Sequence, residues 1–263
     1  MYSEEHIRYL KKLKRNKIII LITQIMLAVL FIATWQLLAH FNLINTFITS
    51  SPSRVLKTII NLHQTNNLYT HIFSTVFETI ISFSVGTIIG IVIATILWWN
   101  SFLSKVLDPY LIVLNSLPKV ALGPIIIIWI GANTTSIVVM ALLISVIVTI
   151  INVLQGFKET DPIKIKLMKA LGATKYQTYF KLVLPSSFNN IISALKINVS
   201  MSLIGIVMGE FLVSKKGIGY LIMYGSQVFN LDLVITGIVI LAIVSAIMYY
   251  LVYYLEKKLS TNN

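Results

Sequence analysis

The chain has 263 residues, of which 57% are hydrophobic and 11% are charged, and its mean hydropathy is +0.86. Soluble globular domains carry about 25% charged residues, so this composition excludes a water-soluble enzyme, and the apolar excess excludes a disordered chain. The formal net charge is +12, but the basic residues fall in short segments between long apolar runs. This pattern indicates a polytopic membrane protein with no nucleic-acid partner. The absence of cysteine excludes disulfides and thiolate metal sites.

Six apolar runs are long enough to be transmembrane helices, because about 20 residues cross a hydrocarbon core roughly 30 Å thick. They lie at residues 18–39, 72–99, 109–131, 134–156, 190–213 and 232–255. The first run follows a basic stretch, as a signal peptide would, but it is longer than a secretory apolar region and lacks a clear cleavage site. The sequence therefore predicts an all-α protein with a basic segment 1–17, a transmembrane domain 18–255 and a tail 256–263.

The basic residues also predict the orientation of these spans. Most Lys and Arg residues fall in the segments 1–17, 100–108, 157–189 and 256–263. The intervening segments of the other side contain only Arg54, Lys57, Lys215 and Lys216. Because Lys and Arg stay on the cytoplasmic side, we expect both termini in the cytoplasm.

The segment after the first span predicts a short amphipathic helix on the outer surface. Ser51 is a good cap, and Pro52 suits the first helical position. One face of this helix would carry the apolar residues Val55, Leu56, Ile59 and Ile60.

Two further patterns concern how the spans are shaped and packed. The third span contains Pro118, Gly123 and Pro124, and proline breaks the hydrogen-bond ladder of a helix. The pairs Gly86-x3-Gly90 and Gly205-x3-Gly209 have the spacing that lets membrane helices approach closely.

The segment 157–189 is too long and too regular for a simple connector. Asp161 and Pro162 predict a helix start, and Gly172 predicts its end. Thr174 and Gln177 have the spacing of a capping box and predict a second helix.

Both predicted helices of this segment have an apolar stripe. The first stripe holds Ile163, Leu167, Ala170 and Leu171. The second holds Tyr176, Phe180, Val183 and Leu184, and Pro185 closes the run. A stripe of this kind needs a partner, either the inner surface of this chain or another protein.

Polar residues inside apolar spans are functional candidates because inserting them costs about 2.5–3.5 kcal/mol when they are charged. Lys119 lies beside Pro118 and would line a translocation path suited to anions, or would extend toward the cytoplasmic face. Asn198 and Ser202 make the fifth span polar, and Glu210 would contact a gate or the loop amides before Gly217. Glu78 is close to the outer surface.

The segment around Gly172 resembles the EAA motif of permease subunits in binding-protein-dependent ABC importers. Ala170-Leu171-Gly172-Ala173-Thr174 is followed, at the spacing of that motif, by Leu182-Val183-Leu184-Pro185. The Glu-Ala-Ala positions hold Lys166, Leu167 and Met168, so the acidic residue of the motif is missing and no ion pair carries over from it.

The resemblance extends over some 200 residues, through segments in the order of one branch of this family. They are 35–39, 51–56, 107–109, 117–124, 209–210, 217–222 and 232–234. That branch transports nitrate, sulfonates, taurine, bicarbonate and related solutes, and some members carry thiamine-precursor pyrimidines or other vitamins.

The resemblance implies a type I permease fold that works as a homodimer in the lipid of the inner (plasma) membrane of a bacterial cell. Its partners would be two ATPase subunits and an extracytoplasmic substrate-binding protein. The coupling segment would contain Ala170, Leu171, Gly172, Ala173, Tyr176, Phe180, Leu184 and Pro185. This chain has no G-x4-G-K-[ST] phosphate loop, so we expect ATP and Mg on the ATPase subunit and no cofactor on this chain.

Two other functional classes stay as alternatives. An ion-coupled secondary transporter also has broken helices, but it usually shows two related halves and does not need a coupling segment. An intramembrane enzyme lacks support because the four histidines form no H-E-x-x-H motif, and no G-x-S-x-G motif is present.

Overall fold

The structure, a computed structural model, describes residues 4–65 and 67–260, without the side chains of residues 4–11, 255, 256, 259 and 260. The first three residues of the expected segment 1–17 and the last three of the tail 256–263 lie outside the described residues. All regular elements in the described part are helical. In chain order they are α1 (Glu4–His40), α2 (Thr46–Thr49), α3 (Pro52–Gln64), α4 (Asn67–Trp99), α5 (Ser101–Ser116), the 3-10 helix η1 (Lys119–Leu122), α6 (Gly123–Ile130), α7 (Thr134–Lys158), α8 (Pro162–Ala170), α9 (Lys175–Thr178), the π-helical turn η2 (Tyr179–Val183), α10 (Leu184–Ser186), α11 (Phe188–Val213), α12 (Ile218–Gln227) and α13 (Leu231–Ser260).

Five of these helices are long and apolar enough to cross a membrane, namely α1, α4, α7, α11 and α13. The expected third span, 109–131, is a bent pair instead: α5 meets η1 and α6 at an angle of 86°. The bend follows Leu117, whose backbone is extended ahead of Pro118, because a residue before proline is pushed out of the helical region. The six expected spans are thus five continuous helices and one broken one.

The expected start of the third span at residue 109 is wrong, because α5 already begins at Ser101. The side chain of Asn100 caps this helix by accepting a hydrogen bond from the N–H of Leu103 at 3.0 Å. Pro109, expected at the start of the span, lies inside α5.

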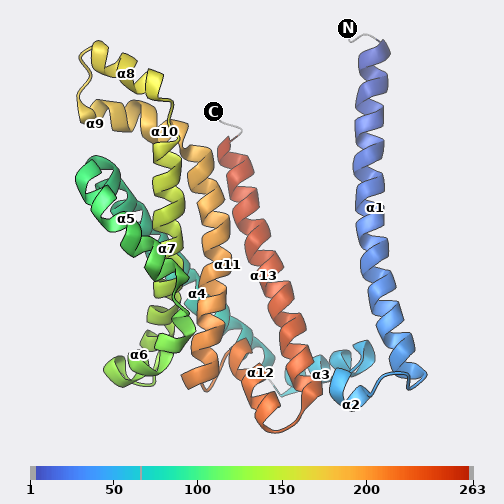
Figure 1. The fold of residues 1–263 in the computed structure, drawn as a ribbon. Helices are drawn as coiled ribbons and strands as arrows, with labels where there is room; N and C mark the ends of the chain where they lie inside the picture. Colours follow the sequence, from blue (N-terminus) through green and yellow to red (C-terminus); the bar gives the residue numbers. More distant parts are fainter. Residues whose placement is uncertain (1–3, 66, 261–263) are drawn as a thin grey trace.

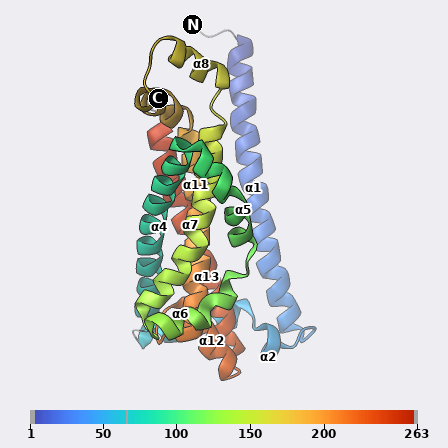
Figure 2. The ribbon, with the colours of Figure 1, turned by 60° about the vertical axis from the view of Figure 1, so that its left-hand side comes forward.

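The two ends of the bundle differ in what they carry (Figure 1). The described ends of α1 and α13 that lead to the termini lie at the same end as α8 and α9, whereas α2, α3, α6 and α12 lie at the opposite end (Figures 1 and 2). This agrees with the expected placement of both termini and segment 157–189 on a single side of the membrane.

Helix α7 lies at the centre of the bundle, between α4 and α11, and two glycine pairs bring the neighbours close to it. A Cβ built on Gly86 or Gly90 of α4 would lie 2.6 Å from Ser145 Oγ or 2.5 Å from Thr149 Cγ2 of α7. A Cβ on Gly205 of α11 would lie 2.4 Å from the Cα of Ala141. Both GxxxG pairs are therefore contact points, and only glycine fits at these separations.

Helix α1 stands apart from the bundle, and none of its best spanning window is buried in this chain (Figure 1). It contacts α3, where the side chain of Gln36 accepts a hydrogen bond from the N–H of Ser53 at 3.1 Å. The apolar surface of α1 is thus left for lipid or for another protein.

Helix α3 has the expected start, with Ser51 as cap and Pro52 in the first turn. Its expected apolar face is only partly right. Val55 is buried and Ile59 packs on the core, but Leu56 and Ile60 are exposed. Leu62 also packs on the core. It follows Ile59 by three residues, as Ile59 follows Val55 by four, and residues at these spacings lie on the same side of a helix.

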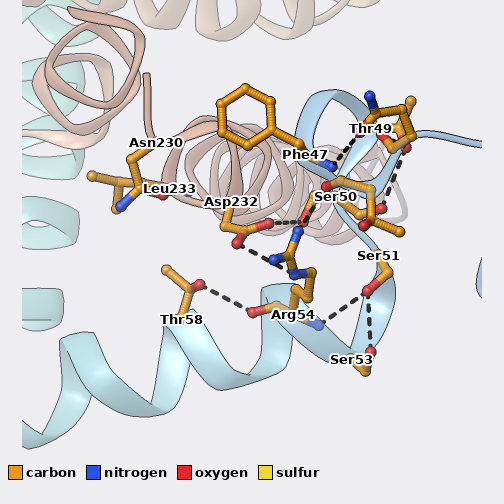
Figure 3. Close-up of polar contacts among 12 residues, drawn as sticks. Phe47, Thr49, Ser50, Ser51, Ser53, Arg54, Thr58, Asn230, Asp232 and Leu233 are labelled. Carbon is orange, nitrogen blue, oxygen red and sulfur yellow. Dashed lines mark hydrogen bonds and ion pairs between the residues drawn. The ribbon is translucent and has the colours of Figure 1, made fainter. Parts of the chain in front are cut away.

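An ion pair ties α3 to the start of α13. Arg54 Nε lies 3.6 Å from Asp232 Oδ2, and Ser50 Oγ donates to Asp232 Oδ1 at 2.7 Å (Figure 3). Arg54 also donates to the carbonyl of Thr46 at 2.8 Å, which links α2 to the same cluster. The segment between α1 and α4 is therefore fixed to the bundle by polar contacts as well as by Val55.

Replacing Gly205 by leucine should force α11 away from α7. The added side chain meets the backbone of Ala141, which cannot move aside, so we expect a loss of about 1–3 kcal/mol or more in stability. The measurement is the midpoint of thermal unfolding of the purified protein in detergent. Ile204→Leu, at an exposed position of the same helix, is the matched control, and an unchanged midpoint for Gly205→Leu would contradict the packing described.

Candidate functional site

The segment between α7 and α11 forms two helical pieces joined by a tight turn. Helix α8 begins as expected, with the side chain of Asp161 accepting a hydrogen bond from the N–H of Ile163 at 2.8 Å. Helix α9 begins with the expected capping box: Thr174 N–H donates to Gln177 Oε1 at 2.8 Å, and Gln177 N–H donates to Thr174 Oγ1 at 3.2 Å. Local sequence thus determines both helix starts.

Gly172 forms the turn between the two pieces, in a left-handed conformation with φ +77°. Its N–H donates to the carbonyl of Lys169 at 3.0 Å, and the N–H of Ala173 donates to the carbonyl of Met168 at 2.9 Å. These two bonds form a Schellman motif, which ends α8. No other group lies within 4 Å of a Cβ built at Gly172, so the turn is open to its surroundings.

The second piece ends at Ser186, one residue after Pro185, which closes the apolar run as expected. Helix α9 continues through the π-helical turn η2 into α10, which contains Pro185. The N–H of Leu184 donates to the carbonyl of Tyr179, five residues earlier. This wider turn lies directly before the proline, which has no N–H to give to the ladder.

Tyr179 anchors this piece to the bundle, and the predicted stripe did not contain it. Its side chain is 3% exposed, and its hydroxyl shares a hydrogen bond of 2.7 Å with Thr95 Oγ1 of α4. The ring lies against Trp98 and Phe157, with centroids 5.0 and 5.5 Å away. Burial raises the pKa of the Tyr179 hydroxyl, with the Thr95 hydrogen bond acting in the opposite direction, so Tyr179 is neutral at physiological pH. The spacing of Tyr179 to the buried Val183 is the signal that could have found it.

Most of the predicted coupling residues are left uncovered by this chain. Leu171, Tyr176 and Phe180 are 74%, 61% and 46% exposed. Among the remaining coupling residues, Ala170, Gly172 and Pro185 are exposed. Ala173 and Leu184 are half-buried. Ile163 and Leu167 of α8 are exposed too. The stripe is thus split: Val183 packs on the chain's own core, and the residues nearest Gly172 have no cover within the chain.

The four candidates for a translocation path do not form one group. Asn198 and Ser202 are fully buried, and Asn198 Nδ2 donates to Thr87 Oγ1 of α4 at 2.7 Å. They are turned into the contact between α4 and α11, so they line no accessible surface in the conformation described.

Glu210 is also buried, at 1% exposed, and it caps a helix. Its carboxylate accepts hydrogen bonds from Thr75 Oγ1 and from the N–H of Gly219, both at 2.6 Å. Thr75 Oγ1 in turn accepts from the N–H of Ile218 at 2.8 Å. A carboxylate satisfies the free N–H groups at the start of α12, as a helix N-terminus prefers. The amide that Glu210 binds thus lies after Gly217, at the start of α12, and not in the loop before Gly217 as expected, and nothing here places Glu210 at a gate.

Lys119 is the exception, because it is only half-buried and lies directly after the bend between α5 and α6. Its Nζ donates to the carbonyl of Asn115 at 2.8 Å, at the end of α5. It does not reach Asp108, which instead forms an ion pair with Lys158 at 3.7 Å. An amine is thus held at a break in an apolar span.

Comparisons with known proteins agree with this architecture. Residues 86–261 match the family model described as "Binding-protein-dependent transport system inner membrane component". An aliphatic sulfonates transport permease protein, SsuC, of Bacillus subtilis is 25% identical over 235 residues, 89% of this chain and 85% of the relative. A formylaminopyrimidine transport permease protein, ThiX, of Halalkalibacterium halodurans is 27% identical over 174 residues, 66% of this chain and 69% of the relative.

A solved structure of the MetNI methionine ABC transporter, in an inward-facing conformation, has the same fold. The TM-score is 0.63 at 18% identity, and the match covers 74% of this chain and 95% of that one. Because the family match spans more than half of the chain, the chain belongs to the family of binding-protein-dependent transport system inner membrane components, and it is the non-catalytic permease component of an ABC importer.

Proposed function

We propose that this chain forms, as a homodimer, the translocation path of a type I importer driven by two copies of a separate ATPase subunit. The observation that carries the proposal is the uncovered apolar surface around Gly172. Leu171, Tyr176 and Phe180 are exposed on a segment that is anchored to the bundle by Tyr179. An exposed apolar patch on a rigid support is typical of a protein-docking surface.

The anchoring makes this surface suited to transmit motion. Tyr179 contacts α4 and α7 through Thr95 and Phe157, and Lys175 Nζ donates to the carbonyl of Trp99 at the end of α4. A shift of the docked ATPase would therefore move α4 and α7 together as a rigid body. ATP and Mg would bind on that partner, and this chain would bind no cofactor.

We infer that the end carrying α8 and α9 faces the cytoplasm, in the inner (plasma) membrane of a bacterial cell. The basic segments 1–17 and 157–189 support this orientation. The opposite end, with α3 and α12, would then receive solute from an extracytoplasmic binding protein. The exposed apolar side chains of the spans would contact lipid.

We further propose a small anionic solute, such as a sulfonate, taurine, nitrate or bicarbonate. Lys119 supports an anion because it holds a positive charge at the break of a span, where the low dielectric strengthens its field. Relatives named for aliphatic sulfonates and for formylaminopyrimidine also leave a thiamine-precursor pyrimidine or another vitamin-like solute as the second candidate.

Gly172→Asp should separate docking from the transmembrane path. The turn has open space, so the aspartate side chain adds no clash, but it places a charge that must be desolvated when a partner covers the surface. We expect a membrane-inserted protein that loses the ATPase subunit, or that holds it without stimulated hydrolysis. The measurements are the subunit ratio of the purified complex and the ATPase stimulation by loaded binding protein.

Gly172→Asn is the matched control for this change. Asparagine has nearly the same shape, tolerates the left-handed conformation and carries no charge. We expect it to retain the ATPase subunit much better than Gly172→Asp. Wild-type values for the aspartate variant in both measurements would mean that this segment is not the coupling element.

Lys119→Met should lower the uptake of an anionic solute while leaving assembly intact, because methionine keeps the length and removes the charge. We expect roughly a tenfold loss, the equivalent of one charge-assisted contact. The measurement is uptake in proteoliposomes at matched protein content. Lys215→Met, which removes one charge from an exposed loop, is the control, and unchanged uptake by Lys119→Met would place the amine outside the path.

Single cysteines can test the orientation, because the chain has none of its own. A cysteine in place of Lys169 should be protected from an impermeant thiol reagent in intact cells and labelled after permeabilisation. A cysteine in place of Lys57, exposed on α3, should be labelled in intact cells. The reverse pattern would invert the proposed topology.

A further inference from the structure

A cleft of about 690 Å³ opens at the end of the bundle opposite α8 and α9. It is formed by the first half of α4, the start of α7 and the loop between α11 and α12. Its lining residues are Tyr69, Thr70, Phe73, Ser74, Phe77, Glu78, Thr134 and Lys216. None of them belongs to the segment around Gly172 or to the broken third span.

Glu78 forms the buried part of this cleft. Its residue is 2% exposed, and Oε1 accepts a hydrogen bond from Ser74 Oγ at 3.1 Å. Oε2 has no hydrogen-bond partner among the described residues. A buried carboxylate oxygen without a donor is costly, so a bound group that donates a hydrogen bond to this atom would be favoured.

Lys216 is held at the same cleft by its neighbours in the loop. Its N–H donates to Ser214 Oγ at 3.2 Å, and Ser214 Oγ donates back to the Lys216 carbonyl. The next residue, Gly217, donates its N–H to His71 Nδ1 of α4 at 3.0 Å. These bonds fix the backbone, and the ammonium forms no ion pair with Glu78 in the described part of the chain.

Aromatic rings of α4 complete the wall. Phe73 and Phe77 are stacked, with centroids 5.7 Å apart and planes inclined by 12°, and both rings are more than half exposed. Tyr69 lies one turn earlier on the same face. The faces of such rings attract a cation, above all an ammonium group.

From this arrangement we propose that the cleft binds a small zwitterion, whose primary ammonium group meets Glu78 and whose anionic group meets Lys216. A metal ion fits poorly, because the described residues contain no cluster of three or more His, Asp or Glu side chains, and Lys216 would repel it. A simple anion fits poorly too, because it would lie against Glu78. The volume is also far larger than one ion needs.

Two sources could supply this chemistry: a free solute, or the ethanolamine headgroup of a phospholipid. This inference rests on the proposed function in one respect: the proposed orientation of the protein decides on which side of the membrane the cleft opens. Wild-type ATPase binding and stimulation in Gly172→Asp would refute the proposed coupling role and leave the binding measurements below unaffected.

The first arm uses the full-length protein in phosphatidylglycerol nanodiscs, which contain no primary amine, and O-phosphoethanolamine as the soluble probe. Calorimetry should show binding that falls at least about tenfold in Glu78→Gln, because one charged hydrogen bond is lost. Lys216→Met should weaken binding comparably. Glu159→Gln, which changes a carboxylate at the other end of the bundle, should leave it unchanged. Phosphocholine, whose ammonium cannot donate a hydrogen bond, should bind more weakly.

The second arm measures by native mass spectrometry how much phosphatidylethanolamine stays bound to the protein taken from mixed vesicles. Retention that depends on Glu78 and Lys216 identifies the lipid as the source, whereas binding of the soluble probe alone identifies a solute. Glu78→Gln keeps the size and can keep the Ser74 contact, and its folding is checked by thermal unfolding. Lys216→Met, in an exposed loop, gives an independent test. Equal binding by wild type and both variants in both arms, or equal binding of phosphocholine, would overturn the proposal.

Discussion

The close approach of α4 and α11 to α7 is the constraint on which the bundle depends. In lipid, helices gain nothing from hiding apolar side chains from one another, so association relies on packing between backbones. Gly86 and Gly90 supply this contact on one side of α7, and Gly205 and Gly209 supply it on the other. Because these glycines let α4 approach the Ser145 and Thr149 side chains of α7, and let α11 approach its backbone, the three helices form one rigid unit, and the remaining elements are positioned relative to it.

This rigid unit decides where polar groups can lie. Glu210 and Asn198 are turned inward, and each finds a partner on α4, so the membrane-buried polar groups hold helices together and hold the start of α12. At the other end, Tyr179 ties the segment around Gly172 to α4. Glu210, Asn198 and Tyr179 thus find their partners within the chain, whereas an apolar surface is left uncovered, as in a subunit of a larger assembly.

Much of this architecture follows from local sequence. A run of about 20 apolar residues can cross a bilayer only as a helix. The five continuous spans were therefore predictable from composition. The caps at Asp161 and Thr174 and the turn at Gly172 also involve residues within one helical turn of each other. The two helix starts and the turn of the candidate docking segment were therefore predictable from the sequence.

Other features depend on which helix faces meet, and the sequence by itself determined none of them. The prolines predict a break in the third span, but they do not give its angle of 86°, nor that α5 and α6 both contact α7. Glu210 had the pattern of a path residue, yet its partner Thr75 lies 135 residues away and turns it into a helix cap. Tyr179 is the buried aromatic residue of the segment around Gly172 because its side chain faces Thr95 of α4. The sequence determined the helices, their ends and the glycine contacts, because these are local patterns. The tertiary structure decided the role of each buried polar group. A hydrogen bond between distant segments exists only once the helices are packed.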